Sequence, residues 1–216
     1  MPPRDSLMIV DPSSFPERQV YRLMISAFIP RPIAFVSTVS RDGVDNCAPF
    51  SFSMGVSSRP VVLGVSVGER DTGLKDTARN ILDTREFVVN LVTEDIAEKM
   101  NIASGDYAGT VSEFDEAGLT RAPSEVVRPP RIADSPVNFE CRLIRTLRVA
   151  DNTVFFGEAL RIHVDDRVIT DGLVDPHKVR AIGRLGGPRY CRTQDIFEMI
   201  RPKVSGPKSA RPTDAR

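Results

Sequence analysis

The stretch PRPIAFVSTVSRDGVDNCAPFSFSMGVSSR, Pro30–Arg59, decides the fold of this chain. Ile33 to Val39 is rich in β-branched and aromatic residues, and Val44 to Phe52 is a second, largely apolar run. Between them Arg41-Asp42-Gly43 contains the Asp-Gly pair that is typical of a tight turn. The stretch therefore predicts an antiparallel β-hairpin that turns at this tripeptide.

Hydroxyl side chains are concentrated at the ends of these two runs. Hydroxyls and free backbone N–H groups can bind the carbonyl and nitrogen edges of a flat ring, or phosphate oxygens, without a full charge. Ser and Thr are also common at strand ends and in turns for local reasons, so each residue alone keeps that second interpretation. The candidate ligand-binding residues of this cluster are Ser37, Thr38, Ser51, Ser53, Ser57 and Ser58.

A second candidate site follows at Lys75-Asp76-Thr77, which opens a segment with helical spacing through Thr84. The first N–H groups of a helix lack partners and its dipole favours an anion, while Lys75 adds a charge and Thr77 a hydroxyl. The alternative is an ordinary Asp76 N-cap with Lys75 in solvent. The spacing favours neither, and both hypotheses stay open.

The other long segments with regular spacing are mainly strands. Residues 61–67 form a nearly continuous apolar run, typical of a strand buried on both faces, and Glu86 to Val92 predicts another strand. Val137 to Val149 and Thr153 to Val164 meet at Asp151-Asn152, a favourable turn pair. They predict a hairpin with the longest ladder in the molecule.

Helical spacing is confined to short segments. We expect an N-terminal arm over 1–16, a leading helix over 17–28 with Ser14 as its candidate N-cap, and further helices after Thr93 and near Glu113 to Ala117. Because hairpin-linked strands do not alternate regularly with helices, the pattern predicts a mainly β fold: a closed antiparallel barrel with attached helices.

Length and composition indicate one domain. The chain has 216 residues, and we expect a single domain over 1–201 followed by a disordered tail over 202–216, which has no periodic apolar residues. The 29 basic and 29 acidic residues cancel, so charge does not favour a nucleic-acid partner. No apolar run is long enough for a signal peptide or a membrane span. Three scattered cysteines fit a reducing, cytoplasmic setting.

Few side chains here match known catalytic patterns. Cys47 has no neighbouring His or Lys and is expected to fill the core, and His163 and His177 lack metal-ligand spacing, so no metal site is predicted. The glycine-rich loop GRLGGPRY, residues 183–190, opens no helix and is not a dinucleotide fingerprint. Its Arg189 and Tyr190 could reach a ligand, or Tyr190 could simply pack on the core.

Several blocks in order resemble the flavin-reductase-like proteins of the FMN-binding split-barrel group. They are RPIAFVSTVSRDGVDNCAPFSFSMGVSSRP, KDTARNI, EFVVNLV, the PP-R-I-ADSPVNFECRL stretch over 129–143, and GRLGGPRY, and together they span roughly Ile25 to Tyr190. The resemblance implies a six-stranded antiparallel split β-barrel of Greek-key topology that binds FMN in a cleft at a homodimer interface.

The resemblance also implies roles for the candidate residues. Ser37, Thr38, Ser51 and Ser53 would line the flavin and its ribityl-phosphate chain, with Ser57 and Ser58 close by. Lys75, Asp76 and Thr77 would approach the phosphate, and the Arg189-Tyr190 loop would cover the ring. The implied activity is hydride transfer from NADH or NADPH to flavin, with electrons passed onward, for example to a monooxygenase component.

Other classes of function stay open on the sequence. One is a flavoredoxin-like FMN-binding electron carrier without nicotinamide turnover. Another is a related split barrel that binds haem or pyridoxal phosphate, and a third is a regulatory ligand-binding module without turnover. No catalytic acid or base is predicted, because in flavin chemistry the cofactor performs the difficult step.

Overall fold

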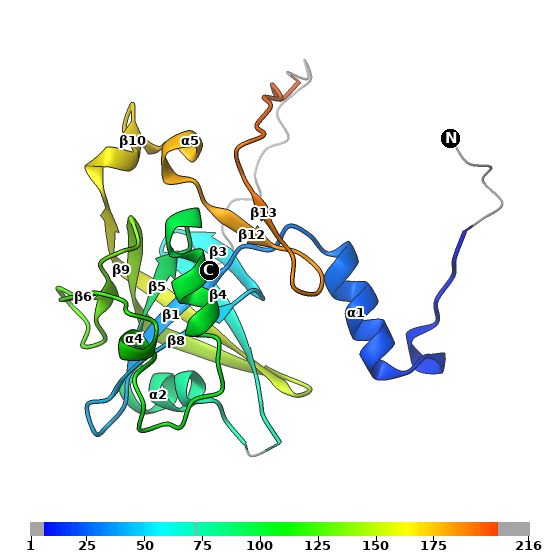
Figure 1. Cartoon of the computed structure of the whole chain (residues 1–216), viewed down its shortest axis with the longest axis horizontal. Helices are drawn as coiled ribbons and strands as arrows, with labels where there is room; N and C mark the ends of the chain where they lie inside the picture. Colours follow the sequence, from blue (N-terminus) through cyan, green and yellow to red (C-terminus); the bar gives the residue numbers. More distant parts are fainter. Residues whose placement is uncertain (1–6, 72, 203–216) are drawn as a thin grey trace, which may run out of the picture.

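A seven-stranded antiparallel sheet forms the centre of the molecule (Figure 1). The structure is a computed structural model that describes residues 7–71 and 73–202; the tail predicted over 202–216 lies, but for its first residue, outside this part. The strand order is β2-β1-β5-β8-β9-β4-β3. The bounds are β1 Ala34–Val39, β2 Asp45–Phe50, β3 Ser53–Ser58, β4 Val61–Gly68, β5 Glu86–Leu91, β8 Val137–Val149 and β9 Asn152–Val164.

Chain connectivity forces this sheet to curl. Strands β2 and β3 lie at opposite edges of the sheet, yet only Ser51 and Phe52 separate them in the chain. In a flat sheet of this order the two edges would stand about 29 Å apart, whereas three Cα–Cα steps span at most about 11 Å. The sheet therefore closes on itself as a barrel that is split between β2 and β3. This confirms the predicted mainly β split barrel, with seven strands in the sheet rather than six.

Both predicted hairpins are present. In the first, β1 pairs with β2 so that Ser37 lies opposite Cys47. In the second, β8 and β9 pair along their whole lengths, with register shifts between Glu140 and Cys141 and between Leu143 and Arg145. No residue of β4 is exposed, in agreement with the apolar run that predicts it. Strand β3 was not expected, because its residues are mostly Ser, Gly and exposed apolar side chains.

The helices are short and lie outside the sheet. Their bounds are α1 Glu17–Ala27, α2 Asp76–Thr84, α3 Ala97–Ile102, α4 Glu113–Glu116 and α5 Pro176–Val179, with 3-10 turns at Pro12–Ser14, Glu94–Ile96 and Asp166–Val168. Short strand pairs are β6 Arg121–Ala122 with β7 Arg131–Ile132, β10 Ile169–Thr170 with β11 Leu173–Val174, and β12 Ile182–Arg184 with β13 Tyr190–Arg192. None of these helices is long and apolar enough to span a membrane, over the residues described.

The leading helix starts later than the candidate N-cap implies. Ser14 belongs to a separate 3-10 turn whose cap is Asp11, and α1 begins at Glu17 after Pro16. The prediction of Ser14 as the cap of α1 is therefore wrong, because the carboxylate of Asp11 accepts from both neighbouring hydroxyls. Helix α1 stands apart from the barrel and buries none of its residues (Figure 1).

Two apolar clusters support the sheet. One joins barrel strands to α2 and includes Val36, Ile81, Phe87 and Phe155. The other includes Phe35 of β1 and packs it against Met100 of α3 and Phe114 of α4. The second cluster thus places α3 and α4 beside the β1–β2 hairpin, next to the free edge of β2.

Candidate functional site

The free edge of β2 forms the floor of a groove that brings together five of the predicted ligand-binding residues: Ser51, Lys75, Asp76, Thr77 and Tyr190. At this edge the Cys47 N–H donates to the Glu113 carboxylate at 3.1 Å instead of to another strand. Two hollows lie along it and are adjacent, since Pro49 and Ser104 line both. We call the whole feature the edge groove, its part at α2 the helix-end hollow and its other part the arginine-end hollow.

The helix-end hollow has a volume of about 100 Å³ and lies at the start of α2. Its lining includes Asn46, Arg70, Lys75, Asp76, Thr77 and Glu113. Lys75 occupies the N-cap position without capping through its side chain, and its ammonium lies 5.9 Å from the centre of the Phe50 ring. The hypothesis that Asp76 is the N-cap is thus wrong, since Asp76 is the first helical residue.

Both cationic and acidic side chains line this end: Arg70 and Lys75, and the carboxylates of Asp76, Asp106 and Glu113. Asp76 lies 2.6 Å from Arg79 and 3.7 Å from Arg70, and Arg70 also reaches Asp106 at 2.5 Å. Lys75 takes part in no ion pair within residues 7–71 and 73–202. A lysine ammonium and the first N–H groups of α2 therefore offer positive charge to a ligand in this hollow.

Glu113 and Asn46 form a buried polar pair behind Lys75 and Thr77. The Asn46 side-chain amide donates to both Glu113 carboxylate oxygens at 2.7 and 2.8 Å, and its carbonyl oxygen accepts from Thr77 at 2.9 Å and from Thr38 at 3.2 Å. Burial raises the pKa of Glu113, although donors from the backbone and Asn46 oppose that shift. Sequence reasoning missed both residues, since nothing in the pattern joins a helix near 113 to a strand at 46.

The hydroxyls of Ser37 and Thr38 lie away from the edge groove. Ser37 and Thr38 are fully buried. Ser37 donates to the Pro130 carbonyl at 2.6 Å and accepts from Asn90, while Thr38 bonds with Asn46 and accepts from Asn80. Their hydroxyls are engaged inside the protein, so these side chains do not line the edge groove.

Of the other four serines predicted to bind a ligand, Ser51 is the one that lines the groove. Its hydroxyl accepts from the Arg31 guanidinium at 3.4 Å. Ser53 donates to the Pro32 carbonyl at 3.1 Å and borders a different hollow, of about 150 Å³, on the inner side of the split. Ser57 and Ser58 are exposed on β3. The structure therefore does not gather the hydroxyl cluster of the sequence into one site.

The arginine-end hollow has a volume of about 190 Å³. Tyr190 lines it and also packs against the apolar cluster of Phe35 and Met100, as the second interpretation of this residue predicts. Arg184 lies over the Tyr190 ring with 4.4 Å between the guanidinium carbon and the ring centre. The two residues are paired across β12 and β13. Sequence reasoning noted the loop that contains Arg184 but selected Arg189, which lies on the far side of that loop.

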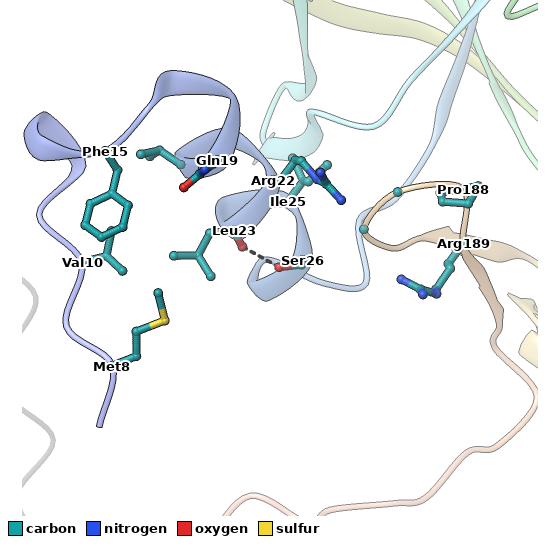
Figure 2. Close-up of a pocket in the computed structure, with 13 residues that line it drawn as sticks. Met8, Val10, Phe15, Gln19, Arg22, Leu23, Ile25, Ser26, Pro188 and Arg189 are labelled. Carbon is teal, nitrogen blue, oxygen red and sulfur yellow. Dashed lines mark hydrogen bonds between the residues drawn. The ribbon is translucent and has the colours of Figure 1, made fainter. Parts of the chain in front are cut away.

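Arg189 lines a separate hollow of about 540 Å³ between α1 and the loop 186–189. Figure 2 shows Met8, Val10, Phe15 and Leu23 around one open space beside α1, with Pro188 and Arg189 across from the helix. This hollow contains none of the other predicted site residues. Its apolar lining and exposed helix are features of a contact surface more than of a polar ligand site.

The cysteines and histidines form no second centre. Cys47 is fully buried, and its burial and the nearby Glu113 raise the pKa of its thiol, in line with the predicted core-filling role. No group of three metal-ligating side chains is found among the residues that the structure describes. The predicted cytoplasmic setting stays a prediction.

Comparisons with known proteins agree with this architecture. The family described as "Flavin reductase like domain" matches residues 25–183. A protein of Aquifex aeolicus is 48% identical over 175 residues, which is 80% of this chain and 89% of that protein. Nitrilotriacetate monooxygenase component B from Bacillus cereus superposes with a TM-score of 0.86 at 30% identity, over 90% of this chain and all of that one. Pseudomonas fluorescens 2-nitrobenzoate 2-nitroreductase NbaA gives 0.82 at 31% identity, over 92% and 100%.

Proposed function

Since the chain belongs to the flavin reductase like domain family, we propose that the protein is a flavin reductase. It would bind FMN along the edge groove and reduce this FMN with NADH or NADPH. The observation that carries the proposal is the groove itself. One end presents a helix start and a lysine without an ion pair in the described part of the chain. The other presents an arginine stacked on a tyrosine, and Pro49 and Ser104 line both ends.

The helix-end hollow suits a phosphate group. The N–H groups at the start of α2 and the Lys75 ammonium favour an anion, and the Thr77 hydroxyl lies at the same wall. Arg70 holds the nearby carboxylates of Asp76 and Asp106 in ion pairs, which reduces their repulsion of a phosphate. Glu113 fixes the amide of Asn46 and so the orientation of the wall behind Thr77.

The arginine-end hollow suits a flat ring. Ile33, Pro49 and Met100 offer apolar surface, and the Tyr190 ring, which Arg184 covers on one face, offers a flat aromatic surface for a ligand ring. The free edge of β2 leaves backbone groups that can bond to the polar rim of a ring. Bound FMN would supply the hydride acceptor, and the chain's own residues would orient the ring and exclude water from one of its faces.

We further propose that the protein acts as a homodimer. Each hollow of the edge groove is smaller than the roughly 300 Å³ at which ligand pockets begin, so a partner would complete the site. Apolar side chains that a partner could cover are exposed on α1, as with Leu23 at 45%, and on β3, as with Met54 at 54%. The hollow beside α1 in Figure 2 adds to this apolar surface.

Two similar proteins of known structure suggest what accepts the electrons from the reduced flavin. The likeness to nitrilotriacetate monooxygenase component B favours delivery of reduced flavin to an oxygenase partner. The likeness to a 2-nitrobenzoate nitroreductase favours a second candidate, direct reduction of a nitroaromatic compound by the bound flavin. Product analysis with 2-nitrobenzoate, compared with flavin-dependent oxygen consumption, separates the two.

The first test measures the phosphate contribution. Wild-type protein should quench FMN fluorescence with a lower dissociation constant than riboflavin, which lacks the phosphate. Lys75→Met should raise the FMN constant about tenfold, because one charge-assisted contact of about 1.5 kcal/mol is lost. It should leave the riboflavin constant unchanged.

Lys178→Met is the matched control, since Lys178 lies in α5 and donates to the Ile169 carbonyl. A wild-type protein that binds neither flavin would overturn the proposed function. If Lys75→Met raised the dissociation constants of FMN and riboflavin equally, the phosphate of FMN would not bind in the helix-end hollow.

The second test separates a reductase from an electron carrier. Stopped-flow mixing of the FMN-loaded protein with NADH, and separately with NADPH, should bleach the flavin absorbance within seconds for a reductase. No bleaching with either nicotinamide, together with retained FMN, would instead establish the carrier.

A further inference from the structure

Arg184 is a positively charged residue of the edge groove whose position is fixed by its neighbours. Its backbone N–H donates to the Arg31 carbonyl at 2.9 Å, and its carbonyl accepts from the Arg31 N–H at 3.0 Å. Its guanidinium stacks on Tyr190 at 4.4 Å. Backbone pairing and side-chain stacking together direct this group into the arginine-end hollow.

Arg184 has no acidic partner among the described residues. Within residues 7–71 and 73–202, neither Arg184 nor Arg31 takes part in any ion pair. The lining of the arginine-end hollow is Ile33, Pro49, Ser51, Met100, Asn101, Ser104, Arg184 and Tyr190, and it contains no carboxylate. The buried carboxylate of Glu140, by contrast, lies beside His163 and accepts from two backbone N–H groups.

Arg31 adds to the positive charge at this end. It is only 3% exposed, and its guanidinium donates to the carbonyls of Ile25, Phe28 and Leu185 at 2.6 to 3.1 Å. Those bonds satisfy its hydrogens but not its charge. Burial, and then the charge of Arg184, lower the pKa of Arg31, so the two guanidinium groups repel each other in the free protein.

Arg184 lines a hollow without a carboxylate and lies near the buried charge of Arg31, so an anion bound in this hollow would supply the missing counter-charge. Resting on the proposed function, we propose that Arg184 stabilises the negative charge that a bound flavin ring would acquire on reduction. A hydride would bring two electrons and one proton to the ring, which would leave the ring with one negative charge. A guanidinium N–H donates there without losing its proton, since arginine stays protonated.

The test is the midpoint potential of bound FMN in the Arg184→Met variant. Met keeps an unbranched apolar stem to pack on Tyr190 but lacks the charge. We expect the preference for reduced over oxidised FMN to fall at least tenfold, which for a two-electron couple lowers the midpoint potential by about 30 mV. Arg184→Lys should recover most of this loss, whereas a purely structural role of the stem would not depend on charge.

Arg41→Met is the matched control, because it removes one charge from an exposed residue that pairs with Asp83. It should leave the potential unchanged. If Arg184→Met does not fold or retain FMN, Arg184→Gln takes its place.

The inference alone is overturned if an FMN-loaded Arg184→Met or Arg184→Gln variant keeps a midpoint potential within about 10 mV of wild type. For a two-electron couple, about 10 mV is roughly a twofold change in the preference for reduced over oxidised FMN. A wild-type chain that binds no FMN overturns the proposed function, and this inference with it. The two failures are therefore distinguishable by the FMN titration that precedes the potential measurement.

Discussion

At the scale of the residue, the best-defined interior charge is Glu140, which is fully buried in β8. Its carboxylate accepts from the N–H groups of Glu125 and Val126 at 2.8 and 2.7 Å and lies 2.6 Å from His163 Nε2. Burial raises the pKa of this carboxyl, but the two backbone donors and His163 together outweigh burial and lower it below its ordinary 4.5. Glu140 thus fixes the loop before β7 to the barrel.

Because the pKa of Glu140 is lowered by folding, its contribution to stability is complete above pH 4.5 and is lost as the pH falls through the lower value of the folded state. We expect Glu140→Gln to lower the free energy of unfolding at pH 7 by about 2 kcal/mol, since charge-assisted bonds to two N–H groups are weakened. The difference from wild type should shrink toward pH 3. Urea unfolding at both pH values measures this.

Glu125→Gln is the control for that experiment, since the Glu125 side chain is 62% exposed and pairs with Arg161. Its effect should stay within about 0.5 kcal/mol. A Glu140→Gln variant with wild-type stability at pH 7 would contradict the assigned role.

Sequence reasoning located part of the candidate site and missed part for a physical reason. Lys75, Thr77, Ser51 and Tyr190 do line the edge groove, because a helix start and a loop after a strand are local features that a pattern can reveal. The fully buried hydroxyls could not be recognised as such, since their partners Pro130, Asn80 and Asn90 lie far away in sequence. Arg184 and Glu113 become visible only once the barrel brings distant elements together.

At the scale of the element, the β8–β9 hairpin shows what local pattern can predict. Its two runs and the turn near Asp151 are present as expected. Gly157, however, has a tertiary role: a side chain there would run into the Phe87 ring and come within 3.0 Å of Cys141 Cβ. The missed strand β3 is the opposite case, because its exposed serines lack the apolar alternation that identifies a strand.

Gly157→Ala should therefore lower the free energy of unfolding by about 1 to 3 kcal/mol, as expected for an extra methyl group in a filled core. The urea midpoint at fixed protein concentration measures it. Gly55→Ala in β3 is the matched strand control, since a Cβ there meets nothing within 4 Å. Equal destabilisation by the two substitutions would show that Gly157 matters for backbone reasons and not for the close approach of Phe87.

At the scale of the whole molecule, helix α1 is the feature that the isolated chain does not explain. It buries no residue of its own and is joined to the body through Arg31, which donates to the Ile25, Phe28 and Leu185 carbonyls. A helix of this kind gains little from its own chain, because helical stability in proteins comes mainly from packing an apolar face. The proposed homodimer would supply that packing.

Sedimentation velocity at micromolar concentration should therefore show a dimer. Leu23→Glu, which places a charge on the exposed face of α1, should shift the protein toward monomer and raise the FMN dissociation constant in parallel. Leu173→Glu is the control, since Leu173 is 74% exposed on β11. Strand β11 pairs with β10, which lies away from α1 in Figure 1. A wild-type monomer, or a Leu23→Glu dimer of unchanged stability, would contradict the proposed assembly.

The two-residue connection at Ser51 and Phe52 has a consequence for how this protein tolerates change in length. Because these residues bridge opposite edges of one sheet, their number limits how far apart the two edges can lie, and Ser51 also lines the edge groove. Insertions in the hairpin turn near Asp42 would enlarge only a surface loop, at a small entropic cost. Insertions between Ser51 and Phe52 would let the seam widen, so relatives of this chain should vary in length at the first place and keep the second constant.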